Sequence, residues 1–414
     1  MPHTEDTLPV RDLKGLLTQK FGENIEIVET KWKHLTDPGE NFGSLILAVD
    51  VVIREANSTW RSLNLVIKLP PPSSYLLKLF NSPETFSKEL IFYRDVSPIF
   101  LEVQRANGLT NGDASWLAAN YYGGRLGLVD HIFDNQACIA LENLNYSGYR
   151  MADRLVGLTR NQTEYAVKQL SKLHAITIAT RLQKPKLFES VVIPALENAA
   201  NEIAEQCIMD MINKALTDLE NIPDAKEDMG CVYRTINATQ QLYESIEPDE
   251  NWLTFVHSDF WGNNMMFRFN GANDQDIVDM KIVDFQLGNY DYGVKDLIFF
   301  LISSPRIDLT EVIFDDMVHL YYDEFINWLK KLNVDTANYK KAKFMELLEA
   351  CGPVKFAQCI AMTQVIKSIP GSAPKMETIE NKESFLQIGG GQAYRDKLLQ
   401  VLTIFKKRRW LVNT

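Results

Sequence analysis

The strongest constraint on this chain is a pair of apolar segments that each lead to acidic or amide side chains. Residues 255–267 read as an apolar strand, a polar loop and a second apolar strand, and the loop carries Asp259 and, five residues later, Asn264. Twenty residues beyond Asn264, another apolar strand ends on Asp284. The intervening residues 268–279 are turn-rich, as a hairpin connection requires. The pattern predicts a hairpin that brings Asn264 and Asp284 side by side.

These three side chains fit the chemistry of phosphoryl transfer. Magnesium commonly takes one or two oxygen ligands from protein and the rest from phosphates and water. An amide oxygen at Asn264 would coordinate without adding carboxylate repulsion, and Asp284 would neutralise the metal's charge. Asp259 would accept or orient the proton of an attacking hydroxyl. Asp and Asn beside strands often only cap turns, so either segment alone leaves that alternative open, whereas the two together favour catalysis.

The first third of the chain is strand-rich. Its β-branched or apolar segments lie at 44–53, 63–69, 115–122 and 137–141. A polar stretch separates the first two, which predicts a hairpin or meander. Three prolines at 70–72 end the second strand, because proline donates no ladder hydrogen bond. Ser-Pro-Glu at 82–84 then opens a helix.

The pattern changes after residue 144. Apolar residues at helical spacing dominate residues 163–180, 195–219, 229–245 and most of the chain from 309 onward. We therefore predict an α+β fold with two lobes. A small, β-rich, nucleotide-binding lobe with one helix spans residues 1–144, and a large, α-helical lobe for catalysis and substrate binding spans residues 145–414.

Two charged residues in the first lobe are candidates for holding a nucleotide. Lys68 lies near the end of an apolar strand, where it would reach the α- and β-phosphates, although such a lysine normally extends to solvent. It would need a carboxylate partner, and the following helix offers Glu89 or, as a weaker choice, Glu84. Taken alone, Glu89 is equally well explained as part of a solvated helix face.

A glycine-bearing turn precedes both strands. Gly39, Asn41 and Ser44 belong to a turn whose backbone N–H groups would cradle phosphate oxygens. The turn matches neither G-x-G-x-x-G nor G-x-x-x-x-G-K-[ST], so a dinucleotide-binding fold and a P-loop ATPase both lose support.

Charge and composition exclude several other classes. The formal net charge of -11 argues against a nucleic-acid partner. The longest apolar run, residues 297–302, is too short to span a bilayer, and the N-terminus lacks the layout of a signal peptide. Five scattered cysteines form no C-x-x-C pair, which favours reduced thiols. We expect a cytoplasmic protein with no membrane span and no nucleic-acid partner.

These residues, in this order, resemble the protein-kinase-like fold and its aminoglycoside phosphotransferase and choline kinase branch. The chain is identified as a member of the ecdysteroid kinase-like (CHK kinase-like) family, found mainly in insects. The resemblance runs from about residue 39 to about residue 301. The segments that carry it are Gly39-Glu40-Asn41, Val66-Ile67-Lys68, Phe86-x-x-Glu89-x-x-Phe92-Tyr93, Leu141-Glu142-Asn143-Leu144, Leu173-His174-Ala175, residues 257–264 (HSDFWGNN) and Val283-Asp284-Phe285-Gln286.

The resemblance implies a role for each matching residue. Asp259 would be the catalytic aspartate, Asn264 and Asp284 the magnesium ligands, and Lys68 with Glu89 the ion pair that serves ATP. The family's reaction implies an alcohol group of a small molecule as acceptor, such as an ecdysteroid, a plant secondary metabolite or another foreign compound.

The resemblance also implies supporting residues. Glu142 and Leu144 would present backbone groups to adenine. Asp296 matches a position that braces the catalytic loop by hydrogen bonds. His257 is more readily explained as a bracing residue than as an acid or base. His174, on an apolar helical face, is expected to be a core residue.

The chain departs from protein kinases at informative positions. Gln286 replaces the glycine of Asp-Phe-Gly, Trp261 replaces a lysine, and no Ala-Pro-Glu segment follows Asp284. A protein substrate is therefore disfavoured. Three hypotheses stay open at this point: an active small-molecule kinase, a catalytically silent member that binds nucleotide or ligand, and a hormone carrier that uses no ATP.

Overall fold

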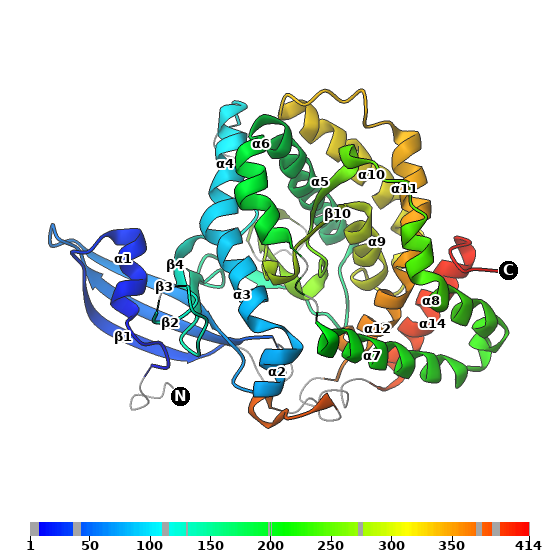
Figure 1. The fold of residues 1–414 in the computed structure, drawn as a ribbon, viewed down its shortest axis with the longest axis horizontal. Coiled ribbons are helices and arrows are strands. Elements are labelled where there is room, and N and C mark those ends of the chain that lie inside the picture. Colours follow the sequence, from blue (N-terminus) through cyan, green and yellow to red (C-terminus); the bar gives the residue numbers. More distant parts are fainter. Residues whose placement is uncertain are drawn as a thin grey trace.

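The computed structural model shows a sheet-rich part joined to a larger helical part (Figure 1). Two of the predicted phosphate-binding residues, Gly39 and Asn41, lie outside the residues that the structure describes. The described residues are 8–35, 43–109, 116–129, 131–197, 199, 201–271, 276–369, 375–382 and 390–413.

A five-stranded antiparallel sheet forms the N-terminal part. Its strands, in spatial order, are β1 (Glu26–His34), β2 (Leu45–Arg54), β3 (Trp60–Leu69), β5 (Cys138–Glu142) and β4 (Tyr121–Arg125). The predicted hairpin is β2–β3, paired from Leu45 with Leu69 to Arg54 with Trp60. Along β2, Leu47, Val49 and Ile53 are fully buried, and they pack with α1 (Leu13–Phe21) into one core. This alternation is what a half-covered antiparallel sheet requires.

Three helices lead from this sheet toward the rest of the molecule. They are α2 (Ser74–Leu79), α3 (Ser82–Ile91) and α4 (Ser97–Ala106), with a π-helical turn, Phe92–Val96, between the last two. Proline in the first turn starts α3, as predicted, because the first N–H groups of a helix need no intrahelical partner. The apolar side chains of these helices belong to the same continuous core as the C-terminal helices, not to the core under α1.

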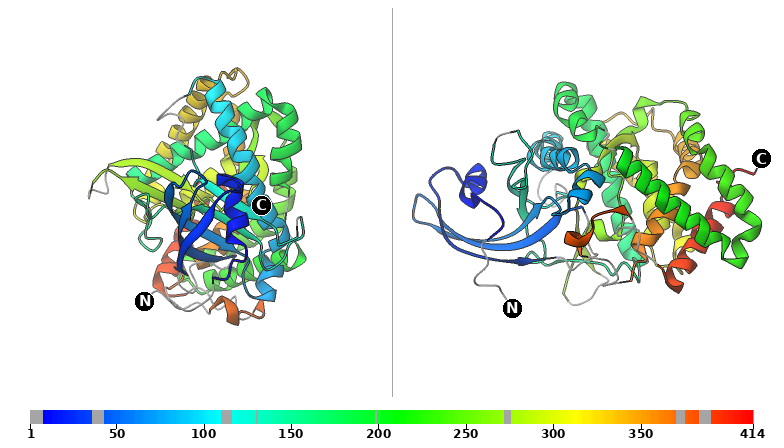
Figure 2. Two further views of the ribbon diagram at one scale, coloured as in Figure 1. Left: turned by 90° about the vertical axis from the view of Figure 1, so that its left-hand side faces the viewer. Right: turned by 60° about the horizontal axis from the view of Figure 1, so that its bottom comes forward.

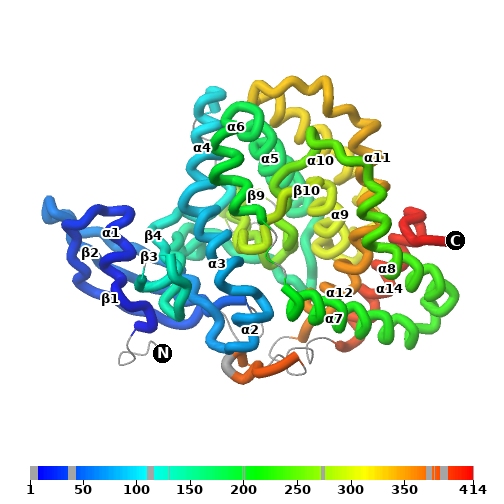
Figure 3. Tube along the Cα trace, in the orientation of Figure 1, coloured from blue at the N-terminus to red at the C-terminus, as the bar shows by residue number. Residues whose placement is uncertain are grey.

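The larger part consists mainly of helices around a buried central one (Figures 1 and 3). These helices are α5 (Arg160–Gln183), α6 (Pro185–Leu187), α7 (Glu202–Glu220), α8 (Met229–Glu244), α9 (Val294–Ser303), α10 (Thr310–Lys331), α11 (Lys341–Val354), α12 (Phe356–Ile366) and α14 (Gln392–Lys407). Every residue of α9 is buried. In the described part of the chain, no helix is both long and apolar enough to cross a membrane.

Two small sheets carry the segments that the sequence singled out. One contains β6 (Tyr149–Met151), β8 (Met265–Phe269) and β9 (Ile277–Ile282), and the other contains β7 (Leu253–Val256) and β10 (Asn289–Tyr292). Strands β8 and β9 form the predicted hairpin, with Met265 opposite Ile282. The α+β fold class, with a small sheet and helix ahead of a large helical region, is confirmed (Figure 2). The lobe boundary at residue 144 stays a prediction.

Lys397 of α14 is an unusual buried cation. Its side chain is 1% exposed and donates to Gln400 Oε1 at 2.9 Å and to Thr310 Oγ1 at 3.3 Å. No carboxylate forms an ion pair with it in the described ranges. Burial, and to a smaller extent the nearby charge of Lys367, therefore lower the pKa of Lys397 to about 7.

This burial predicts a pH-dependent cost in stability. Between about pH 7 and the ordinary lysine pKa of about 10.4, the unfolded chain binds a proton that the folded chain has lost, so the unfolding free energy rises with pH. We expect Lys397→Met to stabilise the protein at pH 7 and to reduce this slope by about 1.4 kcal/mol per pH unit. Urea unfolding at pH 6.5, 7.5 and 8.5 measures it. The exposed Lys168→Met is the control, and an unchanged slope in Lys397→Met would contradict the prediction.

Candidate active site

The loop after β7 is held by side chains from two helices. Ser258 has a φ of 67°, a left-handed conformation that is costly for a residue with a side chain. Asp296 of α9 accepts the backbone N–H groups of His257 at 2.6 Å and Ser258 at 2.9 Å. Gln358 of α12 donates to the carbonyl of Ser258 at 2.8 Å. Both backbone polar groups of the strained residue are therefore paired, and the residue after it, Asp259, is fixed in place.

Asp296 makes the bracing hydrogen bonds that the resemblance implied, whereas Gln358 is absent from the sequence-based prediction. Gln358 lies on an otherwise mostly apolar helix, and a single glutamine with a distant backbone partner leaves no local pattern. Lys355 Nζ in turn donates to Gln358 Oε1, which orients the carboxamide.

Asp259 and Asn264 are in direct contact. Asn264 Nδ2 donates to Asp259 Oδ2 at 2.8 Å and to the backbone carbonyl of Asp259 at 2.9 Å. Both hydrogen bonds use the amide nitrogen, so the amide oxygen of Asn264 is the atom that a metal would take. Burial raises the pKa of Asp259 to about 7, and the charge of Asp284 adds to this effect. A carboxylate with such a pKa is suited to accept a proton near neutral pH.

Lys68 lies between two carboxylates from different elements. Its Nζ is 2.5 Å from Glu89 Oε2 on α3 and 2.9 Å from Asp284 Oδ1 after β9. Burial opposes the charge of Lys68, but Asp284 and Glu89 more than offset this and raise its pKa. Gln286 adds a contact at 3.5 Å from its Oε1 to Lys68 Nζ. The structure thus brings together five of the predicted residues, since Asn264 and Asp284 flank the open end of the β8–β9 hairpin and Asn264 contacts Asp259.

The remaining predicted residues lie around this group. Ser44 is buried at the start of β2, and its neighbour Gly43 is so close to Gln286 that a β-carbon there would lie 3.1 Å from the amide nitrogen. Glu142 ends β5, where its carboxylate accepts from Asn120 Nδ2 at 2.6 Å. The carbonyl of Leu144 accepts the N–H of Tyr149 at 3.0 Å. Among the described residues, neither Glu142 nor Leu144 forms a hydrogen bond or ion pair with the five central residues, and their adenine-binding role stays a prediction.

The donor atoms fit magnesium better than a metal held by protein alone. No cluster of three or more His, Cys, Asp or Glu side chains able to hold a metal occurs among the described residues. Zinc sites normally use three or four such ligands. One carboxylate, Asp284, and one amide oxygen, Asn264, instead match an ion that takes its other ligands from phosphates and water.

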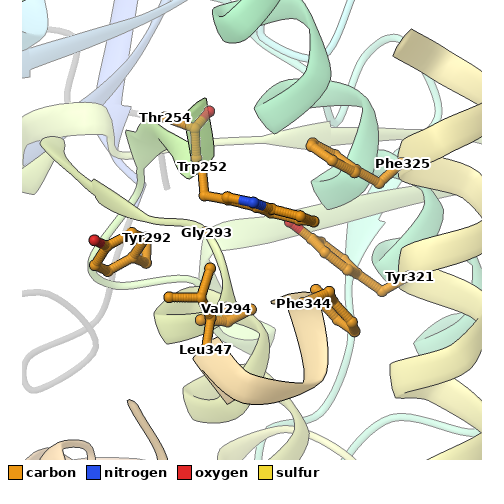
Figure 4. Close-up of a pocket in the computed structure, with 9 residues that line it drawn as sticks. All are labelled: Trp252, Thr254, Tyr292, Gly293, Val294, Tyr321, Phe325, Phe344 and Leu347. Carbon is orange, nitrogen blue, oxygen red and sulfur yellow. The ribbon is translucent and has the colours of Figure 1, made fainter. Parts of the chain in front are cut away.

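A buried histidine lies behind Asp296, the residue that holds the loop after β7. His174 of α5 contacts Tyr321 OH through Nδ1 at 2.6 Å and lies 3.5 Å from Asp296 Oδ2 through Nε2. A small aromatic cavity adjoins this contact, with Trp252, Phe325 and Tyr321 around it (Figure 4). A β-carbon on Gly293 would lie 2.5 Å from His174 Nδ1, so only glycine leaves room for the ring. His174 is a core residue, as expected from its position on an apolar helix face.

Asp296 should therefore contribute strongly to stability. Its side chain is fully buried, and an amide at this position would place N–H donors against the N–H groups of the loop. We expect Asp296→Asn to lower the unfolding free energy by about 2 kcal/mol or more. Urea unfolding measures the loss. The control is Asp308→Asn, which changes an exposed carboxylate paired with Arg306. Equal, small losses in both variants would show that Asp296 is not a brace.

Comparison with known proteins identifies the family to which the chain belongs. The model of the ecdysteroid kinase-like family matches residues 38–334. A search of curated proteins gave no significant match.

Three small-molecule kinases are among the solved structures that match this one. An ethanolamine kinase of Plasmodium vivax has 12% identity and a TM-score of 0.43, with 95% of this chain and 87% of that chain covered. A choline kinase of Cryptosporidium parvum Iowa II has 11% identity and a TM-score of 0.44, with 96% and 93% covered. Spectinomycin phosphotransferase, solved with ADP and spectinomycin, has 14% identity and a TM-score of 0.41, with 95% and 97% covered.

Proposed function

Because the chain belongs to the ecdysteroid kinase-like family, we propose that it is a magnesium-dependent small-molecule kinase. It transfers the γ-phosphate of ATP to an alcohol group, and we propose an ecdysteroid or xenobiotic hydroxyl as acceptor. The observation that carries the proposal is the contact of buried Lys68 with Asp284, together with the β8–β9 hairpin that places Asn264, bonded to Asp259, beside the Asp284 segment.

Each residue has one task in this proposal. Lys68, held by Glu89, would bind the phosphates of ATP as a point charge. Asn264 and Asp284 would hold magnesium, which supplies charge neutralisation for the phosphates when bound. Asp259 would orient the acceptor hydroxyl and take its proton, because burial has already raised the pKa of this carboxyl to about 7.

The balance of charge around Lys68 supports a metal there. One ammonium faces two carboxylates, Glu89 and Asp284, and Asp259 adds a third carboxylate nearby. Burying excess negative charge is costly unless a cation accompanies it. A divalent ion at Asn264 and Asp284 would offset the excess and at the same time attract the phosphates of a nucleotide.

Asp259→Asn tests the catalytic step. The variant keeps the shape of the side chain but cannot accept a proton, so we expect phosphorylated product to fall by at least about a hundredfold. Mass spectrometry of a panel of steroids, amino alcohols and glycosides, incubated with Mg–ATP, detects products heavier by one phosphoryl group. Nucleotide binding should persist in the variant. Product from the wild type that persists undiminished in Asp259→Asn would remove Asp259 from the reaction.

Thermal unfolding with Mg–ATP tests the nucleotide site separately. A ligand that binds only the native state stabilises it, so we expect the wild-type Tm to rise with Mg–ATP and the rise to vanish when EDTA removes the metal. A rise without product in the panel would favour a silent nucleotide-binding member. No rise at saturating Mg–ATP would favour a carrier and contradict the kinase.

A further inference from the structure

Helix α3, which carries Glu89, is attached to the helical part of the molecule by a second charged residue. Lys88 is 4% exposed, and its Nζ donates to two backbone carbonyls, that of Gly288 at 2.7 Å and that of Glu197 at 2.5 Å. Gly288 follows Asp284 by four residues. Successive helical residues point about 100° apart, so one turn of α3 holds Lys68 through Glu89 on one side and the segment after Asp284 on another.

The N-terminus of α3 is attached to the same region by a reciprocal pair of asparagines. Asn81 is the N-cap of α3 but makes no capping hydrogen bond, and its Nδ2 donates instead to the carbonyl of Ala199 at 2.9 Å. Asn201 is the N-cap of α7, and its Nδ2 donates to the carbonyl of Lys78 at 2.7 Å. The start of α3 is therefore joined to the segment before α7, and the start of α7 to the last turn of α2; α2 and α7 lie close together in Figure 1.

The burial of Lys88 costs stability rather than supplying it. In the described part of the chain no carboxylate forms an ion pair with this lysine, and both of its acceptors are neutral carbonyls. Burial lowers the pKa of Lys88 to about 8. An apolar side chain of similar length would avoid the desolvation of an ammonium. The lysine instead fixes the position of α3, because only a donor at the end of a long side chain can reach both carbonyls.

The packing of Gly288 makes its carbonyl a fixed target. A β-carbon on Gly288 would lie 2.8 Å from the ring of Phe255, so the backbone approaches β7 as closely as glycine allows. Phe285, in the same segment, stacks on Phe92 just after α3, with ring centroids 3.7 Å apart. The segment from Asp284 to Gly288 thus contacts α3 and the residue that follows it at two points, through the carbonyl that accepts from Lys88 and through the stack of Phe285 on Phe92.

We propose that Lys88, Asn81 and Asn201 form a clamp that fixes α3 to the helical part before nucleotide binds, so that Glu89 is a preset anchor for Lys68. Lys88 is a positioning residue in this arrangement, since it touches neither the nucleotide nor the reacting atoms. The separate cores agree with the proposal, because α3 shares its core with the C-terminal helices while β2, β3 and α1 form another. The importance of Glu89 itself rests on the proposed function.

Hydrogen exchange of the nucleotide-free protein tests the clamp without relying on activity. We expect amides of α3 to exchange about tenfold or more faster in Lys88→Met, while the Tm stays near that of the wild type. Lys88→Arg keeps a charged donor and should retain most of the protection. Lys168→Met makes the same substitution at an exposed lysine of α5, outside the clamp, and should leave α3 unchanged. Asn81→Gly removes the other contact while tolerating the left-handed φ of 44°, and should also speed exchange.

A second measurement links the clamp to the site. If Glu89 is preset, Lys88→Met should raise the KM for ATP about tenfold and change kcat less, because the loss falls on phosphate binding. Wild-type exchange in α3 of both Lys88→Met and Asn81→Gly would overturn the clamp. A wild-type protein that does not bind Mg–ATP would instead overturn the proposed function, and the exchange result would still decide whether α3 is clamped.

Discussion

One buried ammonium connects three elements of this molecule, two of which lie far from the third in the sequence. Lys68 comes from the N-terminal sheet, Glu89 from the helix that follows it, and Asp284 from a hairpin about two hundred residues later. Burial opposes the charge of both Lys68 and Glu89, and each of the two favours the charged form of the other. The same three side chains therefore link the sheet, helix α3 and the β8–β9 hairpin.

Two residues beside the same group have strained backbone conformations. Ser258 and Asp284 both adopt left-handed conformations with φ of 67°, and each lies at the point where a strand turns into the site. Such conformations persist only where surrounding contacts hold them. Ser258 is held by Asp296 and Gln358, whereas Asp284 is held by Lys68. The fold therefore supports its two central carboxylates, Asp259 and Asp284, by different means: helix side chains fix the first, and an ion pair fixes the second.

The sequence predicts some of these features because they leave local patterns. The β8–β9 hairpin follows from apolar runs around a turn-rich stretch, and it brings Asn264 near Asp284 without any knowledge of the rest. Lys68 could be identified because a lysine is unusual in an apolar strand. Its carboxylate partner was a choice between two glutamates on one helix, and Glu89 is the one that the structure pairs with it. The helical lobe could be expected in outline, since its segments have clear 3.6-residue periodicity.

Gln358 and Lys88 could not be predicted, and the reason is physical. Both donate to backbone carbonyls of residues distant in the sequence, and every residue has a carbonyl, so the partner carries no chemical signature. A lysine on a helix is normally solvated, and Gln358 is one of two glutamines on α12, so the sequence does not indicate which carbonyl it contacts. Only the folded backbone shows that Lys88 and Glu89, neighbours in the chain, contact different parts of the same region: Lys88 the carbonyl of Gly288, and Glu89 the ammonium of Lys68. The residues that bind by charge pairing can be read from the sequence, whereas those that position the elements are found only once the elements are in place.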